Sequence, residues 1–276
     1  MNTPNCLPIR RWFFCACLLL AGLTNISGCA SKSAGAGLAT DGGDIVTESD
    51  EPEIRQRARK RLELAVAYFE QGQTTVALDE LKQSIVTDPT YPQAYNLRGL
   101  IYMRLNDFRV AEDSFRKALA LSPKDSGVMH NLGWLLCQQA KYPQAQEFFS
   151  QALANPKYGE RAKTFRTQGL CQARAGLKEE AEHSLLKSYE FDAGNPVTAY
   201  NLATLLFQRG DFVRALFYVR RLNNSELANA ESLWLGVKLE RRMENRDAMQ
   251  QLATQLMKRF PQSHEAGSYE RGAFDE

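Results

Sequence analysis

The sequence has little net charge, few histidines and only one long apolar run, and each shortage excludes a class of function. Its 34 basic and 32 acidic side chains give a net charge of +2, without the excess of lysine and arginine that a nucleic-acid surface needs. The three histidines, His130, His183 and His264, are not spaced as metal ligands. We therefore expect no nucleic-acid partner and no metal site.

Sequence signatures of catalysis are also missing. No Gly-x-Ser-x-Gly, Walker or zinc-binding pattern occurs, and Gly35 and Gly37 follow no strand that could lead into a phosphate loop. The acidic pair Glu179 and Glu180 is typical of solvated charges at the start of a helix. We expect that the protein is not an enzyme and has no catalytic residue, no cofactor and no small-molecule substrate.

The amino terminus has the pattern of a bacterial export signal. Arg10 and Arg11 precede an apolar stretch of about a dozen residues, which suits a secretory signal and is too short to cross a bilayer. The stretch ends in Ile26-Ser27-Gly28-Cys29, which resembles the lipobox of bacterial lipoproteins. We therefore expect removal of residues 1–28 and acylation of Cys29. In bacterial lipoproteins, Ala30 in place of an aspartate implies export to the outer membrane.

The segment that would follow the lipid is small, polar and glycine-rich. Residues 29–52 cannot bury enough apolar surface to offset the entropy of ordering them. We predict a flexible tether with a mean reach of roughly 25–30 Å.

From Glu53 onward the sequence is internally repetitive. A small residue recurs every 33 to 36 residues, an alanine follows it by twelve positions, and an apolar residue follows that alanine by four. The small residues are Ala65, Gly99, Gly133, Gly169, Ala203 and Gly236. This spacing resembles the tetratricopeptide repeat, a helix–turn–helix unit of about 34 residues. The resemblance implies an all-α superhelix of six repeats over residues 53–262, followed by a short, partly ordered tail at 263–276.

Two positions depart from the repeat pattern. Arg98 stands where a leucine is expected, and Gln172 occupies a position usually held by an aromatic residue or leucine. Six units in phase nonetheless predict the repeat fold.

The first helices of such repeats line a concave face that usually holds a partner. The repeat phase predicts that repeats one and two present an apolar groove suited to an extended or helical peptide. Its residues are Leu62, Val66, Phe69, Asn96, Leu100 and Met103. Alternatively, the tether or neighbouring helices cover these side chains. Repeat four presents a more basic stretch, which could equally be a solvated face: Lys163, Arg166 and Arg174.

Two cysteines remain in the body of the exported chain. Cys137 and Cys171 lie one repeat apart, late in the first helices of adjacent units. An oxidising compartment permits a disulfide if their Cα atoms come within about 7 Å. The alternative is a pair of buried free thiols that pack as small apolar residues.

The whole chain is similar to the PilF/PilW pilotin family of type IV pilus biogenesis lipoproteins. The more specific parts of the resemblance are the segment from His130 to Cys137 and the ending Gly272-Ala273-Phe274-Asp275-Glu276. The family implies a lipid-anchored protein on the periplasmic face of the outer membrane that binds the secretin subunit and promotes its multimerisation, for pilus biogenesis and twitching motility. It also implies secretin contact through the first repeats and a disulfide between Cys137 and Cys171.

Two other binding functions fit the same features. One is a repeat lipoprotein of outer-membrane β-barrel assembly, and the other is a scaffold that docks cell-wall hydrolases. Both would use the same anchor and the same kind of groove.

Overall fold

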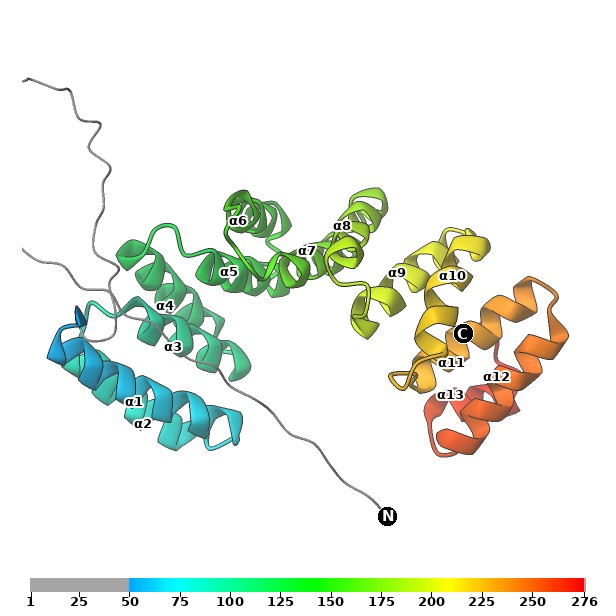
Figure 1. The fold of residues 1–276 in the computed structure, drawn as a ribbon, viewed down its shortest axis with the longest axis horizontal. Coiled ribbons are helices and arrows are strands. Elements are labelled where there is room, and N and C mark those ends of the chain that lie inside the picture. Colours follow the sequence, from blue (N-terminus) through cyan, green and yellow to red (C-terminus); the bar gives the residue numbers. More distant parts are fainter. Residues whose placement is uncertain (1–49, 276) are drawn as a thin grey trace, which may run out of the picture. The chain divides into compact units, whose positions relative to one another are not determined.

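The computed structural model describes residues 50–275, in which every regular element is a helix (Figure 1). Residues 46–276 form a compact unit by themselves. The expectations for the leader, for acylation of Cys29 and for nearly all of the tether fall on residues 1–49, outside the described part.

Helices in the described part come in pairs that follow the sequence repeats. Repeats one to three are α1 (Glu53–Glu70) with α2 (Thr74–Thr87), α3 (Pro92–Arg104) with α4 (Phe108–Leu121), and α5 (Ser126–Gln138) with α6 (Tyr142–Ala154). Repeats four to six are α7 (Arg161–Arg174) with α8 (Lys178–Phe191), α9 (Pro196–Gln208) with α10 (Phe212–Asn223), and α11 (Ala230–Arg242) with α12 (Arg246–Arg259). The predicted all-α fold of six helical hairpins is confirmed.

The same backbone geometry closes the turn inside every repeat. One residue of each turn has a positive φ: Gly72, Asn106, Ala140, Gly176, Gly210 and Glu244. Glycine adopts this left-handed conformation without strain, whereas other residues meet a steric penalty. The turn is therefore fixed by the packing of the hairpin, since even an alanine at position 140 adopts it with φ of 57°.

Small residues let the two helices of a hairpin approach closely. A Cβ atom added to Gly99 would lie 2.4 Å from the ring of Phe115, and one added to Gly133 would lie 2.9 Å from Phe149. Both rings are fully buried. The pairing of a small residue with a large one sixteen positions later is therefore a packing requirement.

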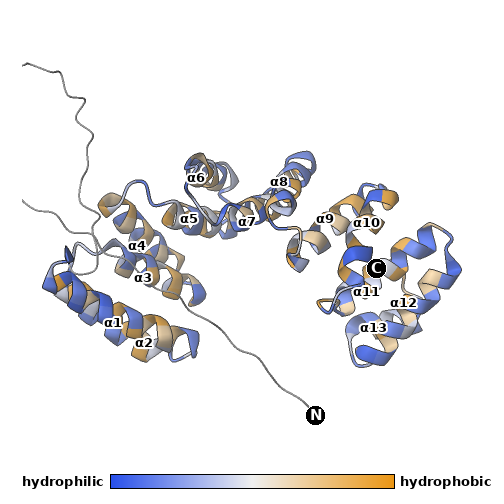
Figure 2. Ribbon diagram, in the orientation of Figure 1, coloured by the Kyte–Doolittle hydropathy of each residue, from blue (hydrophilic) through white to orange (hydrophobic). Residues whose placement is uncertain are grey.

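The buried apolar side chains form a chain of clusters along the repeats. Figure 2 shows that most helices carry both apolar and polar residues, as expected for helices that bury one face. Helix α7 differs, because its buried residues are Thr164, Gln168, Gly169, Cys171 and Gln172. It is the helix in which the repeat pattern loses its leucines.

The carboxyl-terminal tail is more ordered than the sequence indicates. Residues His264–Glu270 form helix α13, which packs against α11 and α12. Beyond it, Phe274 packs its ring on Trp234, with centroids 5.3 Å apart, and the guanidinium of Arg241 lies 3.9 Å from the Phe274 centroid. The tail therefore covers the apolar end of repeat six, as a terminal repeat requires.

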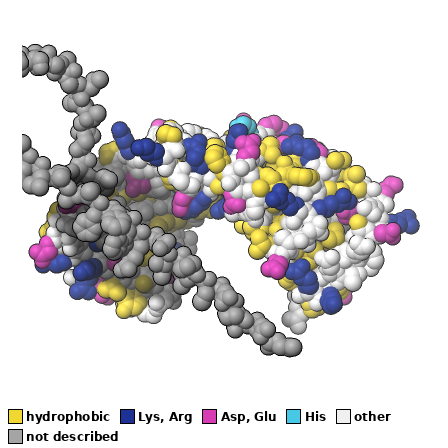
Figure 3. All heavy atoms as spheres, viewed as in Figure 1, with side chains coloured by type: hydrophobic (Ala, Val, Ile, Leu, Met, Phe, Trp, Pro, Cys, Tyr) yellow, Lys and Arg dark blue, Asp and Glu magenta, His cyan; other side chains and the backbone are white. Residues whose placement is uncertain are grey.

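The surface agrees with the near balance of charge. Figure 3 shows basic and acidic side chains interspersed over the visible face. Within residues 50–275, no helix is long and apolar enough to cross a membrane.

Candidate partner-binding face

Five of the six residues predicted to line the groove are half-buried on neighbouring first helices. Val66 and Phe69 lie on α1, and Asn96, Leu100 and Met103 lie on α3, which contacts α1. We call these five residues the amino-terminal face. Their apolar members pack on the core while keeping part of their surface in solvent, so a partner could cover them.

Leu62 does not belong to this face, although the repeat phase places it there. Its side chain is only 8% exposed, and it packs in the core cluster that contains Ala58, Ala65 and Leu81. The prediction of an open position at Leu62 is wrong because the side chain turns toward the second helix of its own repeat and the first helix of the next.

Polar and cationic contacts hold the amino-terminal face together. The Asn131 side chain on α5 donates a hydrogen bond of 2.9 Å to the Asn96 Oδ1 atom on α3. The Arg104 guanidinium lies 5.2 Å from the centroid of the Phe69 ring, within the range of a cation–π contact. Sequence reasoning missed Arg104, which follows Met103 directly and extends the face with a positive charge.

The same row of first helices continues into repeats three and four. The exposed guanidinium of Arg174 on α7 lies 4.8 Å from the centroid of the half-buried Trp134 ring on α5. Lys163 pairs with Glu160 at 2.9 Å, so the predicted basic stretch is partly neutralised. Trp134 was not predicted to be part of this row. Its position directly after Gly133, where the two helices cross, could have indicated it.

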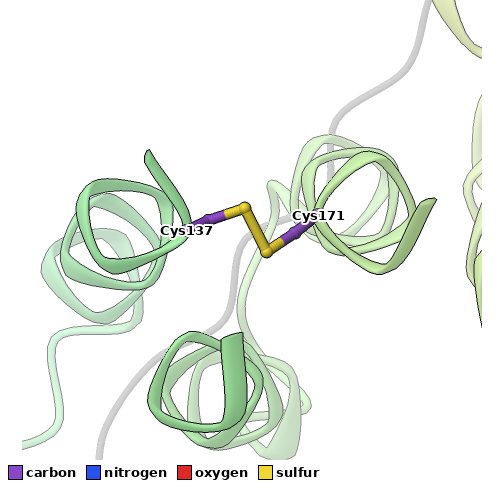
Figure 4. The surroundings of a disulfide bond; sticks show 2 residues. All are labelled: Cys137 and Cys171. Atoms are coloured by element: carbon purple, nitrogen blue, oxygen red, sulfur yellow. A yellow bond between two sulfur atoms is a disulfide. The ribbon is translucent and has the colours of Figure 1, made fainter. Parts of the chain in front are cut away.

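A disulfide joins the first helices of repeats three and four. Figure 4 shows the bond between Cys137 on α5 and Cys171 on α7. Their Cα atoms are 5.9 Å apart, inside the usual range for a disulfide, and both residues are 2% exposed. The bond links two neighbouring units of the partner-binding row, so it restrains their relative motion.

His130 contributes to the junction between repeats three and four. Its side chain is 5% exposed, and its Nδ1 atom lies 2.8 Å from the Thr164 hydroxyl, which also bonds the Tyr158 hydroxyl at 3.0 Å. Burial, reinforced by the positive charge of Lys163, lowers the pKa of His130 to about 4. The imidazole is therefore neutral at pH 7 and ties α5 to α7.

The described residues offer no cluster suited to a metal ion. Across residues 50–275, no three His, Cys, Asp or Glu side chains come together as ligands. Exposed His183 and His264 lie on α8 and α13, far along the chain from His130. What the row of first helices offers is apolar, aromatic and cationic surface for another polypeptide.

Comparison with known proteins supports this interpretation. Family models described as "TPR repeat" and "Tetratricopeptide repeat" match residues 65–106 and 90–157. The chain is 28% identical over 249 residues to the type IV pilus assembly protein PilF of Pseudomonas aeruginosa, covering 90% of this chain and 93% of that protein.

Solved structures agree with the sequence match. The structure of PilW, described as a widely conserved type IV pilus biogenesis factor, superposes with a TM-score of 0.70 at 27% identity, covering 78% of this chain and 98% of PilW. The structure of Pseudomonas aeruginosa PilF superposes with the same TM-score of 0.70, at 26% identity over 79% of this chain and 99% of that chain. The chain is a tetratricopeptide-repeat protein that is similar to the type IV pilus proteins PilF and PilW along most of its length.

The matches to PilF and PilW extend beyond the generic repeat models. They cover between 78% and 90% of this chain, whereas the family models end at residue 157. An uncharacterised protein of Haemophilus influenzae is 30% identical over 135 residues, covering 49% of this chain and 75% of that protein.

Proposed function

We propose that the protein is a pilotin: an outer-membrane lipoprotein that binds the type IV pilus secretin and promotes its localisation and multimerisation. The observation that carries the proposal is the match to PilF and PilW over most of the chain, because PilF is a type IV pilus assembly protein and PilW is a type IV pilus biogenesis factor. The lipobox at Cys29 supports an anchored protein, and the half-exposed apolar side chains of repeats one and two support a protein partner.

The proposed mechanism is capture on a tether and needs no chemical step. Acyl chains on Cys29 would hold the body at the periplasmic face of the outer membrane, since several chains anchor a protein firmly. The amino-terminal face would bind a secretin subunit. Binding on a short tether raises the effective concentration of subunits at the membrane and so favours assembly of the ring.

Phe69→Glu tests the face directly. Phe69 is half-buried and its ring lies under the Arg104 guanidinium, so a carboxylate there places a charge in the contact without emptying the core. The matched control is Val86→Glu, because Val86 lies on the second helix of the same repeat and is 77% exposed. Leu62→Glu is unsuitable, since it would bury a charge in the core.

We expect Phe69→Glu to reduce secretin pull-down by at least tenfold while helical content stays constant. Val86→Glu should bind like the unaltered protein. Equal pull-down by both variants would remove the amino-terminal face from the proposal.

Experiments in cells test the localisation and distinguish the pilotin function from the two alternatives. Membrane fractionation with a secretin multimer gel, comparing the intact protein with Cys29→Ala, should show loss of outer-membrane location and of multimers in the variant. Deletion of the gene should abolish twitching. General defects in barrel proteins would favour β-barrel assembly instead, and cell-wall defects would favour hydrolase docking.

A further inference from the structure

A cavity of about 740 Å³ opens between the second helices of repeats three and four. It is lined on one side by residues of α6, which include Gln146 and Ser150, and on the other by residues at the start of α8, and α7 lies between them. The α8 residues are Glu179, Glu180, His183 and Ser184. The lining residues come from second helices and from the side of α7 that faces them, so the cavity is distinct from the amino-terminal face. Its size is within the range of ordinary ligand pockets.

The floor of the cavity is polar where the repeat pattern calls for leucine. Gln168 and Gln172 correspond to Leu132 and Leu136 in repeat three, and to leucines at 202 and 206 in repeat five, all of which are fully buried. The two glutamines are 6% and 7% exposed. Repeat four therefore replaces two core leucines with amides, both of which line the cavity.

This replacement leaves one amide oxygen without a hydrogen-bond partner in the described fold. The Gln172 Oε1 atom is buried without a hydrogen-bond partner. An unpartnered buried amide destabilises a fold, because it gives up its bonds to water and gains none. A group of this kind at the floor of an open cavity indicates a ligand that supplies the missing bonds.

We propose that this cavity binds an extended peptide segment that carries a basic side chain. An extended backbone presents N–H and C=O groups in alternation, and a glutamine amide offers one donor group and one acceptor to match them. Gln168 and Gln172 lie one helical turn apart on α7, and Gln146 faces them from α6. These three amides pair with the main chain of the segment.

The rim of the cavity supplies the preference for a basic residue. Glu179 and Glu180 line the mouth, both are exposed, and the only other titratable lining side chain is His183. Phe165 forms an apolar wall at the far end, stacked on Phe191 with ring centroids 5.8 Å apart. The two carboxylates at the mouth favour a cationic peptide. A neutral sugar would form hydrogen bonds with the amides equally well, but it would gain nothing from the two carboxylates.

The test uses the purified full chain, isothermal titration calorimetry and three probes. The first probe is the peptide acetyl-Ala-Lys-Ala-Lys-Ala-amide, and the second is the same peptide with its central amides N-methylated. The third is the sugar chitotetraose. The variants are Gln172→Leu and Gln168→Leu, which restore the repeat pattern, and the control is Gln83→Leu, an exposed glutamine on α2.

The lysine peptide should bind the unaltered protein, and each cavity variant should weaken its binding at least tenfold. Gln172→Leu should also raise the melting temperature by about 2–4 °C, since the leucine removes the unpartnered amide oxygen. N-methylation should also abolish binding, and Gln83→Leu should change neither measurement. Equal peptide binding by the unaltered protein and Gln172→Leu, or amide-dependent binding of chitotetraose in place of the peptide, would overturn the proposal.

A second variant keeps the test decisive if the core substitutions disturb folding. Glu179→Gln combined with Glu180→Gln alters only exposed positions. It should remove the preference for the lysine peptide over one with norleucine at the lysine positions. A preference that persists in this double variant would refute the acidic rim as the source of selectivity.

Discussion

Acid should weaken the junction between repeats three and four through one buried side chain, His130. The pKa of His130 is lowered from 6.5 to about 4 in the folded protein, chiefly because burial disfavours the charged form. The unfolded chain therefore binds a proton at a higher pH than the folded chain does. The contribution of neutral His130 to the free energy of unfolding is intact above pH 6.5 and is lost as the pH falls toward 4.

The size of the loss follows from the two pKa values. Between pH 7 and pH 5, the free energy of unfolding should fall by about 2 kcal/mol from this residue alone. For a chain of this size, that corresponds to a decrease in melting temperature of roughly 4–8 °C. Glu160, whose pKa the hydrogen bond from Lys163 lowers, adds some acid sensitivity of its own.

The variant His130→Asn isolates the contribution of the imidazole. Asparagine does not titrate in this range, is the residue found at the equivalent position 96, and can bond the Thr164 hydroxyl. The control is His183→Asn, because His183 is exposed on α8. Thermal melts by circular dichroism at pH 7 and pH 5 should show a smaller acid loss in His130→Asn and an unchanged loss in the control. Parallel losses in all three proteins would refute a buried neutral His130.

Three further outcomes follow from the packing. Reduction of the bond between Cys137 and Cys171, which closes a span of 34 residues, should lower the free energy of unfolding by about 4 kcal/mol in the chain-entropy model, measured by urea denaturation with and without dithiothreitol; an unchanged midpoint would mean that the thiols are free in solution. Gly99→Leu should destabilise by about 3 kcal/mol or prevent folding, because its Cβ alone would lie 2.4 Å from Phe115, whereas Gln83→Leu at an exposed position should not. Phe274→Ala should lower the melting temperature and change Trp234 fluorescence, since the two ring centroids lie 5.3 Å apart; an unchanged spectrum would mean that the tail is undocked.

The repeat fold could be predicted from the sequence because its signal is periodic. Each small residue and its partner sixteen positions later recur in phase, so an error at one unit is corrected by the other five. The turn at Ala140 has no glycine, yet it adopts the same positive φ as the other turns because its flanking helices are in register. Local exceptions do not disturb a pattern that depends on packing between neighbours.

The candidate site was less predictable because it depends on side-chain direction. A shift of one position around a helix separates an open residue from a core residue, and Leu62 is on the core side of that boundary. Arg104 and Trp134 join the row through contacts between repeats, which a pattern within one repeat does not encode. The docking of Phe274 on Trp234 likewise joins residues 40 positions apart that share no repeat register.

The disulfide and the polar helix α7 occur at the same junction, and each explains the other. In a stacked-repeat protein, each unit is held mainly by its neighbours, so a weak interface divides the array into independently opening parts. Helix α7 buries no leucine or phenylalanine of its own and joins the core cluster of repeats two and three through Cys171. A covalent bond from Cys137 to that residue holds repeat four on repeat three without the leucines found elsewhere. The junction can therefore retain two buried glutamines for binding, whereas the same substitutions at an unbridged junction would favour its opening.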